Sequence, residues 1–281
     1  GVRGEILVLN IHSQTGAQFW SYRDASGAWS THGQISFPIR SCYPQVALRN
    51  RSAHVLAIGD IVEPNQEWRT YKHEQTGRDW DYVFRRLFYS WTPDIAQTDF
   101  VAPIELENLD ATGGYIRNLD LWIDPNGAAH ILYLKQPVQS ALMRDKFFPD
   151  IPLTTSLEYC VITEGKIVSQ STLVKGGEGE LSEIPGNGRF HATDDGRLFV
   201  IYYCHGKTEA GNPVSENRML QILPAQENPQ SMRIALAEPF HTFFTAAERG
   251  GSAPSQIIDL FGVGREASIL RYARVKLVPR R

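Results

Sequence analysis

A hairpin-like unit recurs four times along the chain at intervals of about 70 residues, and this repeat restricts the fold more than any other feature. Each unit is an apolar run of strand length, a turn, and a second run that is apolar at nearly every position. The second and third turns, Asp-Pro-Asn-Gly and Asp-Asp-Gly, supply the backbone freedom that a tight hairpin needs. A run that is apolar throughout is typical of a strand covered on both faces. The four units occupy residues 43–60, 119–134, 189–203 and 256–275, with Val46, Leu121, His191 and Ile258 at equivalent places.

Further strand-like stretches lie between the hairpins, for example at 82–91, 156–168 and 218–223, and bring each period to four strands. Four antiparallel strands per repeat are typical of a β-propeller blade. A β-sandwich, the alternative, has no reason to repeat an apolar hairpin at near-constant spacing. We therefore predict an all-β fold, a β-propeller of four-stranded antiparallel blades, with four to five blades present.

The repeat predicts a single propeller domain over residues 1–281 that begins and ends in a partial blade. The predicted units are a partial blade at 1–37, blades at 38–108, 109–180 and 181–250, and a partial blade at 251–281. The first unit lacks a leading strand, and the last has a leading hairpin with nothing after it. The two either complete each other and close the ring, or belong to a ring with further N-terminal blades.

Composition excludes several classes of protein. The 28 basic and 31 acidic side chains give a formal net charge of −3, so a nucleic-acid surface with clustered positive charge is not expected. No apolar run is long enough for a membrane-spanning helix, and a hydrophobic content of 42% suffices for a core. The three cysteines show no Cys-x-x-Cys spacing, and we expect no metal and no cofactor.

One turn near the N-terminus carries a family resemblance. Residues 22–29, Tyr-Arg-Asp-Ala-Ser-Gly-Ala-Trp, resemble the Asp-box of the sialidase-like BNR-repeat propellers, with Asp24, Gly27 and Trp29 in the matching roles and one extra residue between Asp and Gly. The Asp-Pro-Asn-Gly and Asp-Asp-Gly hairpins also look like blades of that family. The resemblance implies a fragment or divergent member, in which Asp24 caps its own turn and Trp29 packs between strands.

The same resemblance implies a glycan as ligand and an extracellular or periplasmic location. Sialidases use an arginine triad, a Tyr–Glu pair and an acidic Asp, none of which maps onto this chain. The segment Phe37-Pro38-Ile39-Arg40 differs from the sialidase Phe-Arg-Ile-Pro because Arg and Pro are exchanged. Sialic acid is therefore not the expected substrate.

Propeller geometry predicts which residues share a working face. The start of the first strand and the end of the second strand of a blade lie on one rim. Binding and catalytic residues often lie in long loops that a rigid scaffold holds at such a rim. The expected long loops are 60–81, 135–155 and 204–217. The residues expected on this rim are Arg40, Tyr43, Arg117, Asp120, Arg189, His191 and Ser255 at strand starts, and His12, Asp60, Glu63, Lys135 and His205 at strand ends.

The residue types on this rim suit a saccharide ligand. The ligand can be an oligosaccharide or a polysaccharide, and it can carry acidic groups. Trp68 lies in a loop rich in carboxylates, aromatics and cations, and aromatic faces stack on sugar rings; alternatively the loop is a solvated segment with its own salt bridges. The arginines at 40, 117 and 189 either converge on an anionic group or pair with neighbouring blades. His12, His191 and His205 are candidates for a general base, whereas His54 and His130 lie on the opposite rim and look structural.

Two kinds of function remain open. The first is a carbohydrate-active enzyme: a glycosidase with Glu63 and Asp120, or Asp60 and Asp120, as its carboxyl pair, or a polysaccharide lyase with Tyr43 or His205 as base and Arg117 neutralising a uronate. The predicted substrate-binding residues are Arg40, Arg117, Arg189, His191, Lys135, Trp68 and His12. The second is a non-catalytic propeller that binds a glycan or a protein. Carboxyl groups about 5–10 Å apart in an open pocket favour a glycosidase, and carboxylates consumed by salt bridges favour the binding module.

Overall fold

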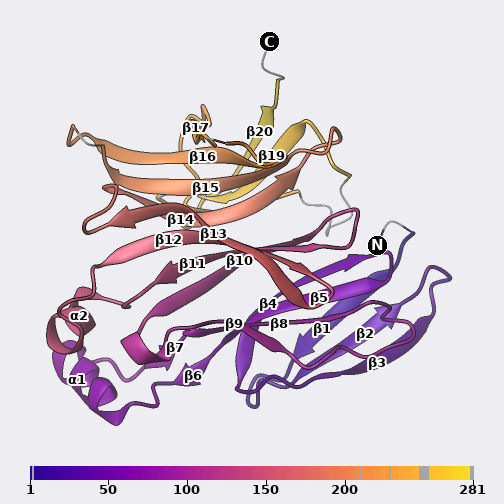
Figure 1. The fold of residues 1–281 in the computed structure, drawn as a ribbon, viewed down its shortest axis with the longest axis horizontal. Coiled ribbons are helices and arrows are strands. Elements are labelled where there is room, and N and C mark those ends of the chain that lie inside the picture. Colours follow the sequence, from indigo (N-terminus) through magenta and orange to yellow (C-terminus); the bar gives the residue numbers. More distant parts are fainter. Residues whose placement is uncertain (2, 209, 228, 247–252, 279–281) are drawn as a thin grey trace.

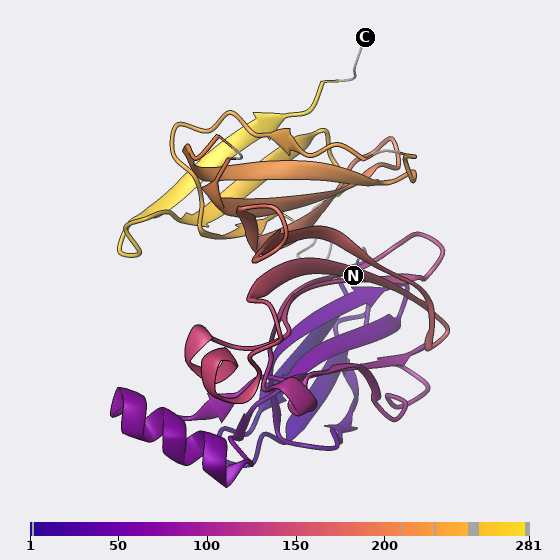
Figure 2. The same cartoon turned by 60° about the vertical axis from the view of Figure 1, so that its left-hand side comes forward.

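A computed structural model describes residues 1–281 except residues 2, 209, 228, 247–252 and 279–281. Strands dominate it and form five main sheets that follow one another from the N-terminal to the C-terminal end of the chain (Figures 1 and 2). The first three sheets are β1 (Ile6–Ile11), β2 (Gln18–Arg23) and β3 (Trp29–Ile35); β4 (Ser41–Arg49), β5 (Ser52–Gly59), β8 (Arg86–Thr92) and β9 (Ile104–Asn108); and β10 (Tyr115–Ile123), β11 (Ala129–Gln136), β12 (Thr154–Thr163) and β13 (Lys166–Gly177). The last two are β14 (Glu183–Ala192), β15 (Leu198–Lys207), β16 (Pro213–Leu223) and β17 (Met232–Arg233); and β18 (Thr242–Thr245), β19 (Ile257–Val263) and β20 (Leu270–Lys276).

The predicted all-β propeller fold of four-stranded antiparallel blades is confirmed. Each sheet is antiparallel, and the first strands β4, β10, β14 and β18 contact one another in succession, as the inner strands of neighbouring blades do. Among the residues that the structure describes, no strand pairing joins the first sheet to the last. A closed ring is therefore not detected.

The first sheet has three strands, β1 to β3, among the described residues, and β1 takes the place of a second strand. The turn after β1 reaches the start of β4, because Arg40 Nη2 donates to the carbonyl oxygen of Ser13 at 3.5 Å and Gln18 Nε2 donates to that of Ser41 at 2.7 Å. β1 thus runs antiparallel to β4, the direction of a second strand.

The predicted equivalence of the fourth hairpin was wrong. Its strands β19 and β20 do pair, but β18 precedes them in the sheet, so β19 is a second strand rather than a first. Cross-strand register also shows that Phe190, not His191, is the residue of the third repeat equivalent to Val46 and Leu121. Val46 pairs with Val55, Leu121 with Ile131, and Phe190 with Val200. The shift arises because an apolar hairpin carries no mark of which two strands of a blade it contains.

The second strands form the centre of each blade. β5 is buried along almost its whole length and β11 along its first six residues, which agrees with their continuous apolar sequences. Core clusters lie between consecutive blades, for example Leu56, Tyr89, Ile131 and Tyr133 between the second and third sheets. Burial on both faces therefore connects each blade to the next.

Two equivalent histidine–tyrosine pairs repeat in the second and third sheets. His54 Nδ1 and Tyr89 Oη are 2.6 Å apart, and His130 Nδ1 and Tyr159 Oη are also 2.6 Å apart. Burial lowers the pKa of His54 to about 3 and that of His130 to about 4, so both rings are neutral. These contacts agree with the structural role expected for both histidines.

In the Asp-box-like turn, Asp24 has the role that the resemblance implied, but Trp29 does not. Asp24 Oδ1 accepts hydrogen bonds from Ser26 N at 2.9 Å and Ala28 N at 3.1 Å, and Asp124 caps the Asp-Pro-Asn-Gly turn in the same way. Trp29, expected between strands, is instead 58% exposed at the start of the outer strand β3.

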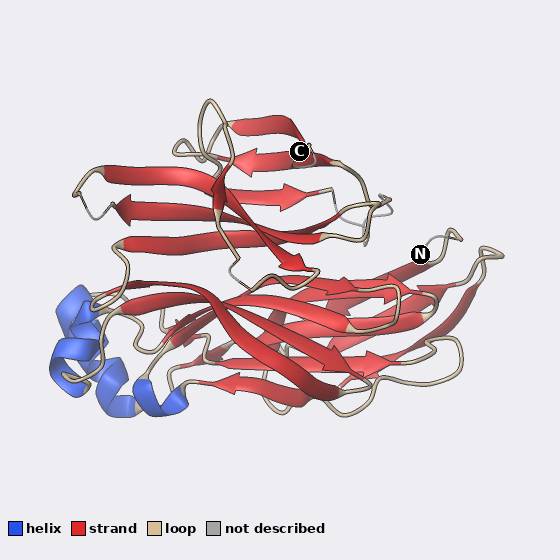
Figure 3. Ribbon diagram, turned by 45° about the horizontal axis from the view of Figure 1, so that its top comes forward, coloured by secondary structure: helices blue, strands red, loops and turns tan. Residues whose placement is uncertain are grey.

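Two of the three expected long loops contain helices, which lie together at one edge of the molecule (Figure 3). Loop 60–81 holds α1 (Gln66–Thr76) between the short paired strands β6 (Ile61–Val62) and β7 (Tyr82–Val83), and loop 135–155 holds α2 (Ala141–Phe147). Asn65 caps α1, and Gly77 ends it with φ of +64°. α1 buries none of its residues completely, so it leaves no periodic apolar signal in the sequence. The third expected loop, 204–217, is mostly strand.

Within the described residues, no helix has both the length and the apolar character needed to cross a bilayer. Cys42, Cys160 and Cys204 are buried and unpaired. The cysteines therefore contribute to the blades as small apolar side chains.

Candidate functional site

Strand register defines the rim on which first strands begin and second strands end. We call it the channel rim. Its cross-strand pairs, from the second sheet to the fifth, are Ser41–Gly59, Tyr115–Gln136, Glu183–Gly206 and Thr242–Val263.

Glu63 is enclosed by cations. Its carboxylate accepts two hydrogen bonds from Arg85, Nη1 to Oε1 at 2.9 Å and Nη2 to Oε2 at 2.6 Å, and a third from Lys72 Nζ at 3.0 Å. Burial disfavours its charge, but Arg85 and Lys72 outweigh that effect and hold the pKa of Glu63 below its ordinary value. A buried carboxylate held by two cations stabilises the base of α1 and presents no free oxygen for proton transfer.

The other two predicted catalytic carboxylates are also engaged. Asp60 is buried and forms an ion pair with Arg40, whose Nη1 also donates to the carbonyl oxygen of Asp60 at 2.7 Å. Asp120 is buried in β10, where Oδ1 accepts from Leu121 N and Oδ2 accepts from Phe190 N in the next blade, each at 2.8 Å. Asp120 therefore links the third and fourth sheets.

Arg189 and His191 lie away from the channel rim. β14 begins at Glu183, earlier than the sequence suggested, so both residues are well inside the strand and both are buried. Arg189 donates to the carbonyl oxygens of Leu119 and Gly188, and its guanidinium lies 4.8 Å from the centre of the Phe244 ring. His191 Nε2 is 2.8 Å from the carbonyl oxygen of Ser255, because β19 starts at the rim opposite to the predicted one. Burial lowers the pKa of His191.

Three further predicted residues have local partners. Lys135 Nζ donates to Glu107 Oε2 at 2.6 Å. Trp68 packs on Phe148, with ring centres 5.3 Å apart, and the guanidinium of Arg85 lies 5.1 Å from its ring, so it anchors α1 to the segment around α2. His12 is exposed, with Nδ1 3.0 Å from Thr15 Oγ1, in the turn that reaches Arg40.

Tyr43 and Arg117 are predicted residues that lie on neighbouring inner strands with exposed side chains. Tyr43 is 61% exposed on β4, and Arg117 is exposed on the neighbouring inner strand β10. Asn118, next to Arg117, donates from Nδ2 to the carbonyl oxygen of Tyr43 at 2.5 Å. Among the described residues, the Arg117 guanidinium has no hydrogen bond or ion pair with the protein.

The backbone of Tyr43 is strained. Its φ is +51°, in the left-handed region that a tyrosine seldom adopts, at the irregularity where β4 and β5 lose register between Cys42 and Gln45. Such strain is of the order of 1–3 kcal/mol and persists where the surroundings impose it, often at functional sites. It turns the ring of Tyr43 outward at the channel rim.

Tyr43 belongs to a group of aromatic rings that sequence reasoning did not assemble. We call it the aromatic rim cluster, and its five members are Tyr43, Trp80, Tyr82, Phe84 and Tyr115. Phe84 is its centre, with ring centres 5.8 Å from Tyr43, 6.1 Å from Tyr115 and 6.3 Å from Trp80. Trp80 is 66% exposed and packs against Tyr82 at 5.7 Å, and the guanidinium of Arg40 lies 5.4 Å from the Tyr82 ring. The density of aromatics between 79 and 84 was the only sequence signal.

His205, the last predicted catalytic residue, is exposed near the end of β15, two sheets beyond Tyr43. It stacks on Tyr203, with ring centres 5.6 Å apart. Within the described chain, no contact connects it with Tyr43 or Arg117. The two lyase bases proposed from the sequence therefore belong to different parts of the rim.

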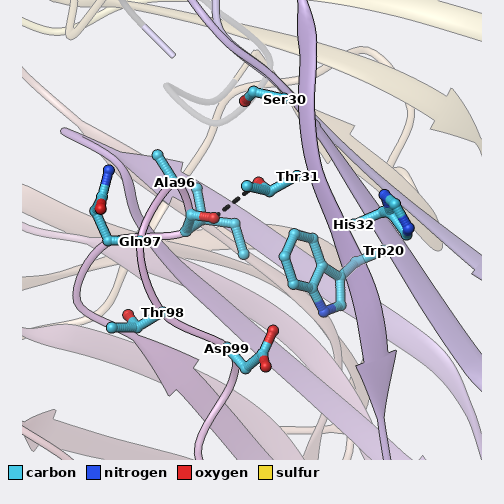
Figure 4. A pocket seen from close by; sticks show the side chains of 9 residues that line it. Trp20, Ser30, Thr31, His32, Ala96, Gln97, Thr98 and Asp99 are labelled. Carbon is cyan, nitrogen blue, oxygen red and sulfur yellow. Dashed lines mark hydrogen bonds between the residues drawn. The ribbon is translucent and has the colours of Figure 1, made fainter.

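A separate pocket of about 320 Å³ lies between the first two sheets (Figure 4). Its walls include the rings of Trp20 and His32, and Thr31 Oγ1 donates to the carbonyl oxygen of Ile95 at 2.9 Å. The wall from 95 to 99 follows the end of β8, on the rim opposite the channel rim. None of the residues predicted to act on a ligand lines this pocket.

Comparison with known proteins supports the fold only. The sequence matches no known protein-family profile and no curated protein. An α-L-arabinanase from Penicillium chrysogenum, solved with arabinobiose, superposes with a TM-score of 0.52 at 11% identity, covering 96% of this chain and 74% of that one. A protein of unknown function from Dyadobacter fermentans gives 0.53 at 10% identity, covering 96% and 78%. The propeller architecture is shared, and no match supports the resemblance to BNR-repeat sialidases.

Proposed function

We propose that the channel rim of the second and third sheets binds an acidic oligosaccharide. The observation that carries this proposal is the exposed aromatic rim cluster, with the exposed Arg117 on the adjoining inner strand β10. Tyr43 and Trp80 offer exposed faces for sugar rings, and Arg117 offers two parallel N–H groups for a carboxylate. The likeness to an α-L-arabinanase solved with arabinobiose makes a saccharide the first ligand to try.

Binding is favoured over hydrolysis because the predicted carboxyl groups are occupied. Glu63 is held by Arg85 and Lys72, Asp60 by Arg40, and Asp120 by two backbone amides. A glycosidase needs one carboxyl group that protonates the leaving oxygen and another that attacks or activates water. Neither role suits a group whose oxygens are already bonded.

The test is calorimetric binding of a galacturonate oligosaccharide. Replacing Arg117 with Ala removes a charge-assisted hydrogen bond of about 1.5–3 kcal/mol and should weaken binding about 10- to 100-fold. The matched control is Lys166→Ala, which removes an exposed cation where β13 begins, away from the channel rim. Equal affinity in R117A and K166A would refute the site.

A tryptophan pair tests the aromatic half of the site. Trp80→Ala should weaken binding about tenfold, since stacking is worth roughly 1 kcal/mol or more. Trp29→Ala removes a tryptophan of similar exposure, 58% against 66%, from outside the cluster, and should leave the affinity unchanged. Loss of binding in both variants, or in neither, would contradict the assignment.

Uronate elimination is the second candidate, because Tyr43 is exposed on β4 and Arg117 is exposed on the neighbouring strand β10. In that reaction the Tyr43 hydroxyl oxygen passes its own proton to water and takes the proton from C5, the bond from C4 to the glycosidic oxygen breaks, a C4=C5 double bond forms, and water gives a proton to the leaving oxygen. Tyr43→Phe separates the two functions: it keeps the ring for stacking and removes the base. Unsaturated-uronate absorbance that appears with the parent and disappears with Y43F supports elimination, and no absorbance with either leaves binding alone.

A further inference from the structure

Two histidines flank one tyrosine on the channel rim of the fourth and fifth sheets. The ring centre of Tyr203 lies 5.6 Å from that of His205 and 4.5 Å from that of His241. His205 is near the end of the second strand β15, and His241 immediately precedes the first strand β18. Both positions are on the same rim as Tyr43, two and three sheets further along the chain.

A third cation joins these rings. Arg265 follows the end of β19, which is again the channel rim, and its charge acts on His241. Burial lowers the pKa of His241, and the neighbouring His205 and Arg265 lower it further. The two histidine rings are therefore adjacent to one tyrosine, and Arg265, on the same rim, acts on His241 through its charge.

Among the described residues, the side chains of His205, His241 and Arg265 form no hydrogen bond and no ion pair with the protein. The Tyr203 hydroxyl is 3.0 Å from Ser215 Oγ, a neutral group. The acidic groups on the adjoining elements are engaged elsewhere or solvated: Glu183 and Glu216 both pair with Arg218, Glu238 pairs with Arg271, and Glu266 is exposed. The cluster thus has donors and positive charge that the protein does not neutralise.

We propose that His205 and His241, which both contact Tyr203, form with Arg265 beyond the end of β19 an anion-binding subsite for a carboxylate or sulfate group of an acidic saccharide. Arg265 supplies a permanent charge, and each imidazole supplies an N–H donor and, once protonated, a second donor and a charge. The Tyr203 ring is the platform on which the two imidazoles are held. The identity of the ligand as a saccharide rests on the proposed function, whereas the preference for an anion rests on this cluster.

The subsite is pH-dependent. A bound anion favours the protonated imidazolium form, so the anion is held more tightly as the pH falls. The titratable and charged groups that face the imidazoles are Tyr203 between them, and His205 and Arg265, which both act on His241. Affinity for an acidic oligosaccharide should therefore rise about tenfold from pH 7.5 to pH 5.5, the gain expected when a neutral N–H donor becomes charged and its hydrogen bond strengthens by about 1.5 kcal/mol.

The experiment measures the dissociation constants of a galacturonate and a sulfated galactan oligosaccharide at pH 5.5 and 7.5. The parent should show the tenfold pH effect, and the double variant H205Q/H241Q should reduce it to less than about twofold while keeping its circular-dichroism spectrum. The control H32Q removes an exposed histidine on β3, outside the rim, and should keep the full effect. Comparison of the two oligosaccharides identifies whether carboxylate or sulfate is preferred.

Failure of this subsite and failure of the proposed function are distinguishable. If R117A and W80A lose affinity but H205Q/H241Q keeps the parental pH effect, the rim site stands and the histidine subsite is refuted. If the parent binds without any pH effect, the subsite is likewise refuted. If the pH effect vanishes in H205Q/H241Q while R117A and W80A bind as the parent does, the subsite stands and the aromatic rim site is refuted. If neither oligosaccharide binds the parent at pH 5.5, both are refuted.

Discussion

The paired histidines His54 and His130 should make the fold lose stability as the pH falls below 7. Each is buried, and each forms a 2.6 Å hydrogen bond to a tyrosine hydroxyl of the neighbouring strand. Burial lowers the pKa of His54 to about 3 and that of His130 to about 4. In the unfolded chain both titrate at the ordinary value of about 6.5.

The sign and size of the effect follow from these values. Because the folded pKa lies below the unfolded one, the stability is fully present above pH 6.5 and falls as the unfolded state takes up protons that the folded state does not. Between pH 7 and pH 5.5 each histidine removes about 1.2 kcal/mol of unfolding free energy, and the two together remove about 2.5 kcal/mol. The carboxylates scarcely titrate in this window, so their contribution is small.

The fold itself suggests the variants for the test. In the fourth sheet, cross-strand register places Phe199 and Met219 where the second sheet has His54 and Tyr89. The double variants H54F/Y89M and H130F/Y159M therefore copy a pair that a blade of this protein already contains, and they leave no buried hydroxyl without a partner.

Urea denaturation at pH 7 and pH 5.5 measures the effect. Each double variant should lose about 1.2 kcal/mol less than the parent over this interval, and the combined variant about 2.5 kcal/mol less, whatever its stability at pH 7. H32Q, which removes an exposed histidine, is the control and should lose as much as the parent. An identical pH dependence in the parent and the combined variant would refute the conclusion that these rings are buried and neutral.

Three further substitutions test the reading of individual residues. Glu63→Gln leaves Arg85 as an uncompensated buried cation and should lower the unfolding free energy by about 3–5 kcal/mol. The control Glu74→Gln, on the exposed face of α1, should change it by less than about 0.5 kcal/mol. Equal chemical denaturation curves for the two variants would contradict the enclosed ion pair. Asp120→Ala removes the acceptor for Leu121 N and Phe190 N and should lower the unfolding free energy by about 1–3 kcal/mol, with faster amide exchange at Phe190. Tyr43→Asn relieves the positive φ and should raise the unfolding free energy by up to about 1 kcal/mol while weakening glycan binding, and a destabilised Y43N would show that the backbone there is not strained.

Much of the fold is determined locally in the sequence. The Asp-Pro-Asn-Gly turn is closed by Asp124 through bonds to residues two and four positions away, so its geometry needs no distant partner. The apolar runs of β5 and β11 predict strands covered on both faces, and both are buried. Repetition of such units limits the architecture to a radial array of antiparallel sheets.

The candidate site was predicted only in part, because its partners are far apart in the sequence. Glu63 meets Arg85 across 22 residues and Asp120 meets Phe190 across 70, and nothing in the spacing of a carboxylate shows which amide or cation will reach it. Those bonds engage carboxylates that the sequence had offered as catalytic candidates. Tyr43 and Arg117 remained exposed for the same kind of reason: the positions of their strands bring no ion-pair partner to either side chain among the described residues.

The sequence by itself determined where strands and turns form, since these depend on the period of apolar residues and on turn chemistry within a few positions. Only the tertiary structure decided that β19 is a second strand, that α1 fills the loop after β6, and that the rings around Phe84 gather at one rim. These outcomes depend on register and packing between distant segments. A charged side chain can be exposed for a ligand or held in an ion pair, and the sequence alone does not show which. The packing of distant segments decides between the two.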